Sequence, residues 1–298
     1  MRIEHQFSIA GFEVSVSFPD GWDADTLLPS FRPFYGKKEG QEKALLKCTV
    51  CTSVENKAAM PSGELIENTL SDMGYVSLYK EAEGYCVTLS AEQGGTLHVM
   101  QADRRFSTVR VYLHEEDKRA GHALSSLLRI AYSQAVLYWD AVSIHASAVF
   151  CENQAFLFMG KSGTGKSTHS ALWLKYIPGT ELLNDDNPTL RIVNGRVYAY
   201  GTPWSGKTPC YKSLSYPVGG MVRLKQAPAN RFVRQQEIEA FIALFPGCCV
   251  IHQDAELRAC LYDTLIRMVE QVPVGVLECR PDGEAALLCR NMLLRTDK

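Results

Sequence analysis

The chain has 298 residues, which is enough for one large domain or two of ordinary size. Its hydrophobic fraction of 46% and charged fraction of 21% exclude a disordered or collagen-like chain and are typical of a globular protein with a core. Lys and Arg total 31 against 33 for Asp and Glu, so the formal net charge is -2 and the broad basic surface of a nucleic-acid-binding protein is not expected.

The N-terminal segment and the cysteines predict a cytoplasmic protein. Met1–Phe7 lacks the apolar region of a secretory signal, and no stretch approaches the ~20 apolar residues of a membrane-spanning helix. We therefore expect no membrane partner and reduced thiols at the ten cysteines. Cys48 and Cys51 form a lone CxxC, whereas a closed zinc site needs four ligands, so half-buried thiols in a strand are the favoured interpretation.

The first third of the chain has the pattern of a β-rich region. Apolar and polar residues alternate through Ile3–Ile9 and again through Phe12–Phe18, which predicts a hairpin with one buried face. A helix is predicted at Ser62–Met73, and Leu28–Phe34 is an aromatic and proline-rich loop that either packs onto the sheet or lines a groove. Further strands are predicted at residues 45–52, 75–81, 85–89, 96–102 and 108–113.

A cluster of charges at Glu115–Arg119 marks the predicted boundary between a β-rich domain, residues 1–119, and a second domain, residues 120–298. The second domain begins with a helix in which apolar residues recur every three or four positions. Strands are then predicted at Val142–Phe150, Gln154–Met159 and Pro273–Cys279, and helices at Arg234–Leu244, Asp254–Val272 and Gly283–Leu294. Alternating strands and helices predict an α/β fold.

A glycine-rich segment, Gly160–Ser167, matches the phosphate-loop pattern G-x-x-x-x-G-K-[ST] in full. Glycines let the backbone curl so that successive N–H groups point at phosphate oxygens. Lys166 would supply positive charge to the β- and γ-phosphates, and the Ser167 hydroxyl would ligate magnesium. The predicted nucleotide-binding residues are Gly160, Lys161, Ser162, Gly163, Thr164, Gly165, Lys166, Ser167 and Thr168.

The context of this segment favours nucleotide binding over a chance glycine-rich turn. The apolar strand Phe156–Met159 leads into it, and Thr168–Ile177 can leave it as a helix. The N-terminus of such a helix carries partial positive charge and unpaired N–H groups, so it faces an anion favourably.

Two adjacent carboxylates, Asp185 and Asp186, follow the next predicted strand. A bound triphosphate needs a divalent cation, and the cation needs a carboxylate. One aspartate could ligate Mg²⁺ while the other accepts the proton of an acceptor hydroxyl as general base. A solvated turn is the alternative, because Pro188 follows and Asp and Asn are common in turns. The neighbouring phosphate loop favours the functional interpretation.

Two further candidates are less specific. His145 lies in an apolar strand, where a histidine is more often a core residue than a catalyst. The segment Tyr200–Pro209 is rich in glycine and proline and contains Trp204 and Lys207. This segment either closes over a nucleotide, with Trp204 excluding water and Lys207 against the γ-phosphate, or is an ordinary surface turn.

Taken together, these residues resemble the catalytic domain of HPr kinase/phosphorylase. The resemblance rests on His145-Ala146-Ser147, the Gly160–Ser167 loop and the strand ending in Asp185-Asp186, and it covers about residues 140–295. The related group includes HPr-kinase-like proteins and the kinases that tailor lasso peptides, and it shares its nucleotide fold with phosphoenolpyruvate carboxykinase. Gly201–Gly206 is similar to a segment of the HPr-kinase-like branch.

The resemblance implies an α/β P-loop kinase domain that uses ATP and Mg²⁺. It implies that the paired aspartates serve as metal ligand and general base, and that His145 lies near the transferred phosphate. We assign the metal to Asp186 and the base to Asp185, with the reverse assignment left open. The glycine-rich signature that follows the catalytic core of HPr kinases is not found, and the N-terminal region is not similar, so the acceptor stays open.

The sequence therefore predicts an ATP-dependent kinase that phosphorylates a hydroxyl, most simply a Ser or Thr of a peptide or small protein. A small-molecule hydroxyl is the nearest alternative acceptor. A nucleotide hydrolase or switch, and a nucleotide-binding module without catalysis, are alternatives of other classes. The sequence decides neither whether ATP or another nucleoside triphosphate is the donor nor whether the protein forms a homo-oligomer.

Overall fold

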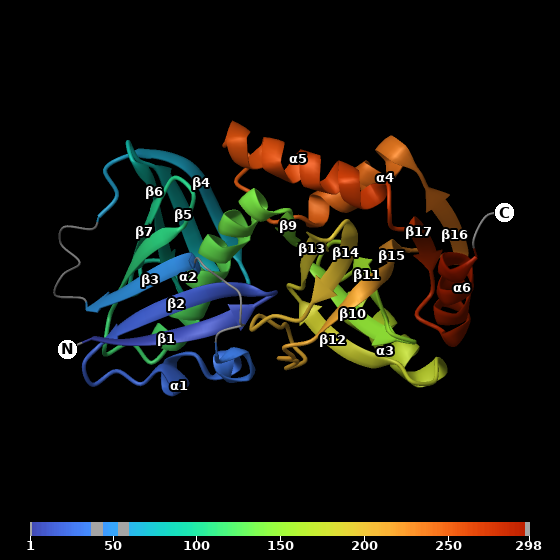
Figure 1. The fold of residues 1–298 in the computed structure, drawn as a ribbon, viewed down its shortest axis with the longest axis horizontal. Coiled ribbons are helices and arrows are strands. Elements are labelled where there is room, and N and C mark those ends of the chain that lie inside the picture. The colour runs from blue at the N-terminus through green and yellow to red at the C-terminus, as the bar shows by residue number, and fades with distance from the viewer. Residues whose placement is uncertain (1, 37–43, 53–59, 296–298) are drawn as a thin grey trace. The chain divides into compact units, whose positions relative to one another are not determined.

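The computed structural model describes residues 2–36, 44–52 and 60–295 and divides into two compact units, Met1–Tyr138 and Trp139–Lys298. The whole is a mixed α/β protein in which each unit is built on its own sheet (Figure 1). The division falls after helix α2 (Ala120–Ala135), whereas the sequence suggested a boundary before it. Because the apolar side of α2 packs onto the strands of the first unit, this helix belongs to that unit.

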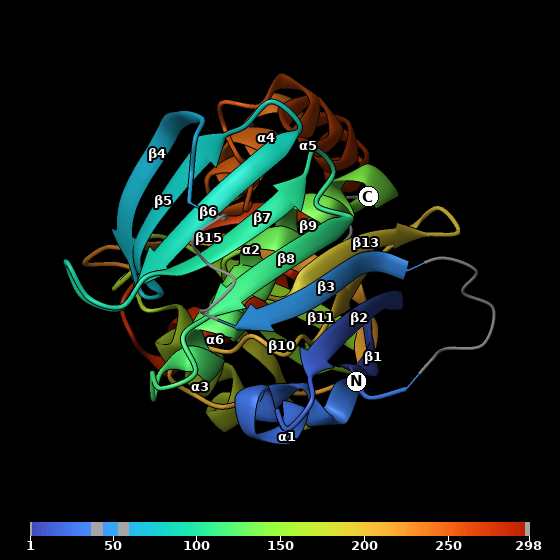
Figure 2. The same cartoon turned by 90° about the vertical axis from the view of Figure 1, so that its left-hand side faces the viewer.

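In the first unit, the residues that the structure describes form an eight-stranded sheet in the order β1-β2-β3-β8-β7-β6-β5-β4 (Figure 2). The β2–β3 and β3–β8 pairs are parallel and the other pairs are antiparallel. The predicted N-terminal hairpin is confirmed as β1 and β2. The strands are β1 (Arg2–Ile9), β2 (Phe12–Pro19), β3 (Ala44–Thr52), β4 (Glu64–Ser71), β5 (Gly74–Lys80), β6 (Gly84–Ser90), β7 (His98–Asp103) and β8 (Thr108–Leu113).

One face of this sheet is covered by α2, whose buried side chains include Leu124, Leu127 and Leu128. The aromatic loop after the short helix α1 (Ala24–Leu27) is a 3₁₀ helix, η1 (Pro29–Phe34), that buries Phe31 and Phe34. Packing is therefore the use of these aromatic residues. The CxxC cysteines lie in β3 as buried free thiols.

The helix predicted at Ser62–Met73 is wrong, because this segment forms the edge strand β4. It pairs along its length with β5, which begins after the turn at Gly74, with φ +112°. Most β4 side chains are exposed, so the segment has little apolar periodicity of its own. The neighbouring strand, rather than local preference, determines its conformation.

Nine strands occur among the described residues of the second unit, and the long strand β15 belongs to two arms of its sheet. One arm follows the order β12-β10-β11-β15-β17-β16, and the other continues from β15 through β14 and β13 to β9. The β11–β15 and β15–β17 pairs are parallel. The strands are β9 (Ala141–Ser143), β10 (Ala146–Cys151), β11 (Gln154–Met159), β12 (Glu181–Asp186), β13 (Thr189–Val193), β14 (Arg196–Tyr200), β15 (Ser215–Gln226), β16 (Arg231–Gln235) and β17 (Val274–Cys279).

Helices pack on both faces of the first arm. Alternate residues of β15 point to opposite faces: Val222 and Leu224 join the core under α3 (Lys166–Tyr176) and α6 (Gly283–Leu294). Arg223, between them, donates to backbone carbonyls of α4 (Glu237–Leu244) on the other side. Helix α5 (Ala255–Val269) packs against α4 and β9. Trp173 of α3 is fully buried in the core beneath α3 and α6.

Two element predictions in this unit need correction. The apolar run Val142–Phe150 is two strands rather than one, because β9 pairs with β13 whereas β10 pairs with β11 and β12. His145 lies at the change of partner, and its backbone N–H donates to Gly247 O at 2.7 Å. The helix predicted at Arg234–Leu244 begins only at Glu237, because Arg231–Gln235 pairs with β17 as a strand.

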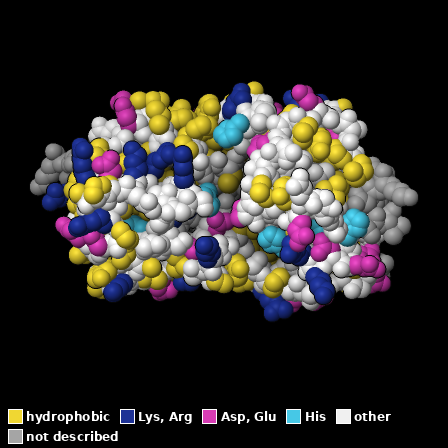
Figure 3. Space-filling model, turned by 180° about the vertical axis from the view of Figure 1, so that it is seen from behind, with side chains coloured by type: hydrophobic (Ala, Val, Ile, Leu, Met, Phe, Trp, Pro, Cys, Tyr) yellow, Lys and Arg dark blue, Asp and Glu magenta, His cyan; other side chains and the backbone are white. Residues whose placement is uncertain are grey.

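Charged side chains of both signs are interspersed with apolar ones on the face seen in Figure 3. Within the described residues, no helix is long and apolar enough to cross a membrane.

Candidate functional site

The glycine-rich loop connects β11 to α3, so the predicted strand–loop–helix context is present in the second unit. Gly163 and Gly165 have φ values of +80° and +101°, which residues other than glycine rarely adopt. Thr164 closes the turn, since its N–H and its hydroxyl both donate to Lys161 O, at 3.1 and 2.6 Å. Helix α3 starts at Lys166, and its first N–H groups are therefore directed toward the loop.

Lys166 folds back over the loop, and its Nζ donates to Gly160 O at 3.0 Å. Partial burial lowers the pKa of this lysine, and the carboxylates of Asp186 and Asp185 act in the opposite direction. The lysine therefore lies within electrostatic reach of both aspartates. Ser162, Ser167 and Thr168, the other predicted polar contacts of the phosphates, have exposed side chains.

The acidic pair is placed beside the loop by the pairing of β10 with β12, which sets Ser147 opposite Asp185. Asp185 is 5% exposed, and its Oδ1 accepts from Ser147 Oγ at 2.7 Å. Ser147 Oγ is in turn 2.6 Å from Ser170 Oγ, on the helix that follows the phosphate loop. Asp185 Oδ2 is buried and has no hydrogen-bond partner among the described residues. A buried carboxylate oxygen without a partner fits a site that receives a cation.

Asp186 has different surroundings. Its Oδ1 lies 3.0 Å from His145 Nδ1, in a pair whose side chains are 12% and 44% exposed respectively. If Nδ1 carries the proton and its N–H donates a hydrogen bond to the carboxylate, Nε2 of the same ring is left as an acceptor. His145 is therefore a partly exposed side chain oriented by a carboxylate, and not the core histidine that its apolar strand suggested.

Asn184, fully buried, joins the acidic pair to the Tyr200–Pro209 loop. Its Nδ2 donates to Trp204 O at 3.0 Å and to Thr202 O at 3.3 Å, while its Oδ1 accepts from the backbone N–H of Asp186 and Asn187. This residue was not predicted from the sequence, because an asparagine beside two aspartates is equally common in simple turns.

The same loop lies directly against the aspartates. Gly206 N donates to Asp185 O at 3.0 Å, and a Cβ at Gly206 would lie 2.6 Å from that carbonyl oxygen. Ser205 forms a β-bridge with Asp186. Lys207 follows and is exposed. Trp204 is 5% exposed, so it anchors the loop rather than offering its ring to a ligand.

The arrangement combines a glycine-rich loop at a helix N-terminus, a lysine, two carboxylates and an oriented imidazole in one unit. No group of three or more His, Cys, Asp and Glu that could hold a metal occurs in the described part of the chain. A magnesium ion would instead need few protein ligands, with phosphate oxygens and water completing its shell, as is usual for this metal. Ser167 and the unpartnered Asp185 oxygen have the oxygen chemistry that Mg²⁺ prefers.

Comparison with known proteins does not assign the chain to a family. No family model matches the chain, and no curated protein matches it. Among solved structures, the chain is similar to the Hpr(Ser) kinase/phosphatase from Coxiella burnetii, with 14% sequence identity and a TM-score of 0.31. The similarity covers 51% of this chain and 87% of that one. A similarity this low says nothing about the reaction.

Proposed function

We propose that residues 139–298 form a P-loop kinase domain of the HPr kinase type, which transfers the γ-phosphoryl group of ATP to a hydroxyl. A Ser or Thr of a peptide or small protein is the proposed acceptor. The observation that carries the proposal is the buried Ser170–Ser147–Asp185 chain of hydrogen bonds. It ties the helix of the phosphate loop to the acidic pair, so that phosphate-binding groups and carboxylates are held together.

In this proposal the loop positions the triphosphate and the lysine neutralises its charge. Backbone N–H groups of Gly160–Lys166 would bind phosphate oxygens, and Lys166 would leave Gly160 O to reach the β- and γ-phosphates. Mg²⁺, when bound, neutralises the charge that develops on the transferred group and the leaving oxygen. Such transfer is governed by positioning and electrostatics, because the transition state is loose.

We further propose that Asp185 is a metal ligand and that His145 with Asp186 is the general base. This is the reverse of the roles assigned from the sequence. It is supported by the burial of Asp185 and by its unpartnered Oδ2. It is also supported by the greater exposure of His145, since a base must be reached by the acceptor hydroxyl. Nε2 of His145 would take the proton, while Asp186 holds the ring and stabilises its positive charge.

Lys207 is proposed to contact the γ-phosphate. The support is the position of the loop, since Gly206 touches the backbone of Asp185 and Lys207 is the next residue. A cation there would neutralise charge on the equatorial oxygens during transfer.

The test is a transfer assay with γ-labelled ATP, Mg²⁺ and a mixture of Ser- and Thr-containing peptides. We expect label on peptide, and we expect Lys166→Ala to lower transfer by about 10²-fold or more. The matched control is Lys175→Ala on the same helix, because this lysine lies over the Tyr176 ring and not at the loop. Release of inorganic phosphate alone would indicate a hydrolase, and bound ATP that stays intact would indicate a module without catalysis.

A further inference from the structure

Strand β4 lies at one end of the sheet of the first unit (Figure 2). Its inner edge pairs with β5, and no other strand of the described residues pairs with its outer edge. Alternate residues of an edge strand direct their N–H and C=O groups away from the sheet, where a further strand can pair with them. The outer edge of β4 is therefore a place where an extended peptide could join the sheet.

Both ends of β4 are held by side chains from other parts of the first unit. The Glu81 carboxylate accepts from Ser62 N at 2.9 Å, Ser62 Oγ at 2.8 Å and Gly63 N at 3.0 Å, which fixes the residues before the strand. After the strand, Arg129 Nη2 of α2 donates to Asp72 Oδ2 at 3.0 Å. The edge is thus already formed before a partner arrives, which lowers the entropic cost of binding.

A bulge in β4 brings its two leucines to one face. Leu65 lies opposite Tyr79 of β5, the register then skips one residue, and Leu70 lies opposite Tyr75. Residues five positions apart would point to opposite faces of a regular strand. With one residue skipped, Leu65 and Leu70 share the face of the two tyrosines. They are 50% and 65% exposed, so this face of the edge is apolar and open.

The other face of β4 carries two glutamates. Glu64 and Glu67 lie opposite Lys80 and Leu78, which alternate with the tyrosines along β5. The exposed Glu67 carboxylate accepts from Thr69 Oγ1, on the same face, at 3.1 Å. Lys80 is one strand further into the sheet than Glu64. A strand added to β4 would therefore lie next to both glutamates, and this face attracts positive charge.

We infer that the outer edge of β4 binds an extended peptide segment in which basic residues alternate with apolar ones. Paired with β4, such a segment sets its Lys or Arg side chains beside the glutamates and its apolar side chains beside the leucines. Opposite charges and apolar pairs on neighbouring strands both stabilise a sheet. The inference concerns the first unit alone and does not rest on the proposed kinase function.

The charges disfavour a second copy of this chain as the occupant. Two copies of β4, paired antiparallel about a two-fold axis, would form one continuous sheet with equivalent faces on the same side. Glu64 and Glu67 of both copies would then lie together, and like charges on neighbouring strands are destabilising. A peptide with basic residues on that face avoids this repulsion.

The experiment uses a labelled ten-residue peptide in which Lys alternates with Val, titrated with the full chain and followed by fluorescence anisotropy. We expect saturable binding that Glu67→Lys weakens by about threefold or more. The matched control is Glu83→Lys, which makes the same charge change at an exposed residue between β5 and β6. Leu70→Ser should also weaken binding, whereas Ile3→Ser, 46% exposed on β1 at the other end of the sheet, should not.

Two further peptides of the same sequence test the backbone pairing. One is N-methylated at every Lys and the other at every Val. Only one of these sets directs its N–H groups at β4 in an added strand. We therefore expect one methylated peptide to lose binding and the other to retain it, whereas attraction by charge alone would treat the two alike.

The inference is overturned if the parent does not bind the peptide, if Glu67→Lys and Glu83→Lys bind it equally, or if the two methylated peptides bind equally. A dimer of the parent, detected by sedimentation and lost in Leu70→Ser, would assign the edge to a second copy instead. Thermal unfolding checks that the variants, all at exposed positions, are folded. The transfer assay is separate, so either proposal can fail while the other stands.

Discussion

Asp185 and Asp186 are adjacent in the chain, yet the protein surrounds their carboxylates differently. Asp185 faces the interior, where one oxygen accepts from Ser147 and the other has no partner among the described residues. Asp186 faces a partly exposed imidazole. Successive residues of a strand point to opposite sides, so this difference follows directly from their places in β12.

Removing the charge of Asp185 should therefore affect a different property of the protein than removing the charge of Asp186. We expect Asp185→Asn to raise the Mg²⁺ concentration that ATP binding requires, because it removes a carboxylate ligand. We expect Asp186→Asn to leave Mg-ATP affinity within about threefold and to lower transfer by about 10²-fold, the usual scale for a general base. Magnesium titrations followed by calorimetry and steady-state rates measure both effects. The opposite pattern would restore the roles assigned from the sequence.

Two lysines of the segment between β14 and β15 offer a matched comparison. Lys207 is exposed beside the acidic pair, whereas Lys212 pairs with Glu181 at 2.9 Å and lies over the Phe150 ring. We expect Lys207→Met to lower the transfer rate by about tenfold or more while ADP affinity stays unchanged, because ADP lacks the γ-phosphate. Lys212→Met should change neither quantity. Equal effects of the two substitutions would mean that Lys207 acts only through the overall charge of the loop.

At the scale of the element, helix α3 joins the parts of the candidate site. Its first residue is Lys166. The Ser170 hydroxyl is hydrogen-bonded to Ser147, which in turn donates to Asp185. His169 and Leu172 line a cavity beside the glycine-rich loop. Trp173 fastens the helix to the core and donates to His169. Because the helix is one rigid body, a displacement of its buried side would move Lys166, Ser170 and the cavity wall together.

The burial of His169 makes this helix sensitive to acid. The histidine has a pKa of about 4 in the folded protein and about 6.5 when exposed, so between these values the unfolded chain binds more protons. Stability from the neutral ring is complete above about pH 6.5 and is lost as the pH falls toward 4, by at most about 3 kcal/mol.

His169→Gln should reduce this dependence, because glutamine can accept from Trp173 and does not titrate. Calorimetric unfolding of parent and variant between pH 7.5 and 4.5 provides the measurement. His98, whose pKa burial also lowers, is present in both proteins and cancels in the comparison. Parallel stability curves for the two proteins would show that His169 does not cause the acid sensitivity.

At the scale of the whole molecule, the parts made by consecutive residues could be predicted from the sequence. The hairpin of β1 and β2 follows from alternation on either side of a tight turn. The glycine-rich loop consists of neighbouring residues, so its curled backbone follows from the order of its glycines, including Gly163 and Gly165 with their positive φ values. Helix α6, Gly283–Leu294, has the predicted bounds because Asp282 caps it.

Features that depend on partners distant in the chain were not predicted. β4 is a strand because β5 pairs with it, and no local pattern says so. The contacts of Asn184 with Thr202 and Trp204 join segments whose meeting depends on the whole sheet. The same holds for the placement of Ser147 next to Ser170, since a serine in a strand or helix carries no sign of its partner.

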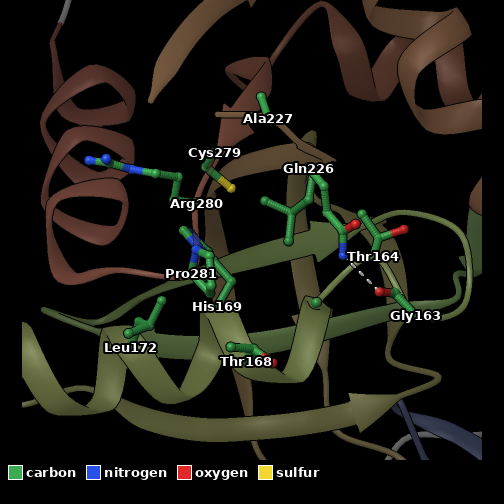
Figure 4. A pocket seen from close by; sticks show the side chains of 12 residues that line it. Gly163, Thr164, Thr168, His169, Leu172, Gln226, Ala227, Cys279, Arg280 and Pro281 are labelled. Atoms are coloured by element: carbon green, nitrogen blue, oxygen red, sulfur yellow. Dashed lines mark hydrogen bonds between the residues drawn. The ribbon is translucent and has the colours of Figure 1, made fainter. Parts of the chain in front are cut away.

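Cys279 places a thiol in the wall of the cavity of about 500 Å³ beside the glycine-rich loop (Figure 4). Cys248 and Cys289, by contrast, are buried in the core. Burial raises the pKa of Cys279, so at neutral pH it is a protonated and slow nucleophile toward dissolved alkylating reagents. A ligand of this cavity that carries a mild electrophile would be held close to this sulfur at high effective concentration, which compensates for the low thiolate fraction. Covalent capture at Cys279 would thereby convert a reversibly bound ligand of the cavity into a permanent occupant.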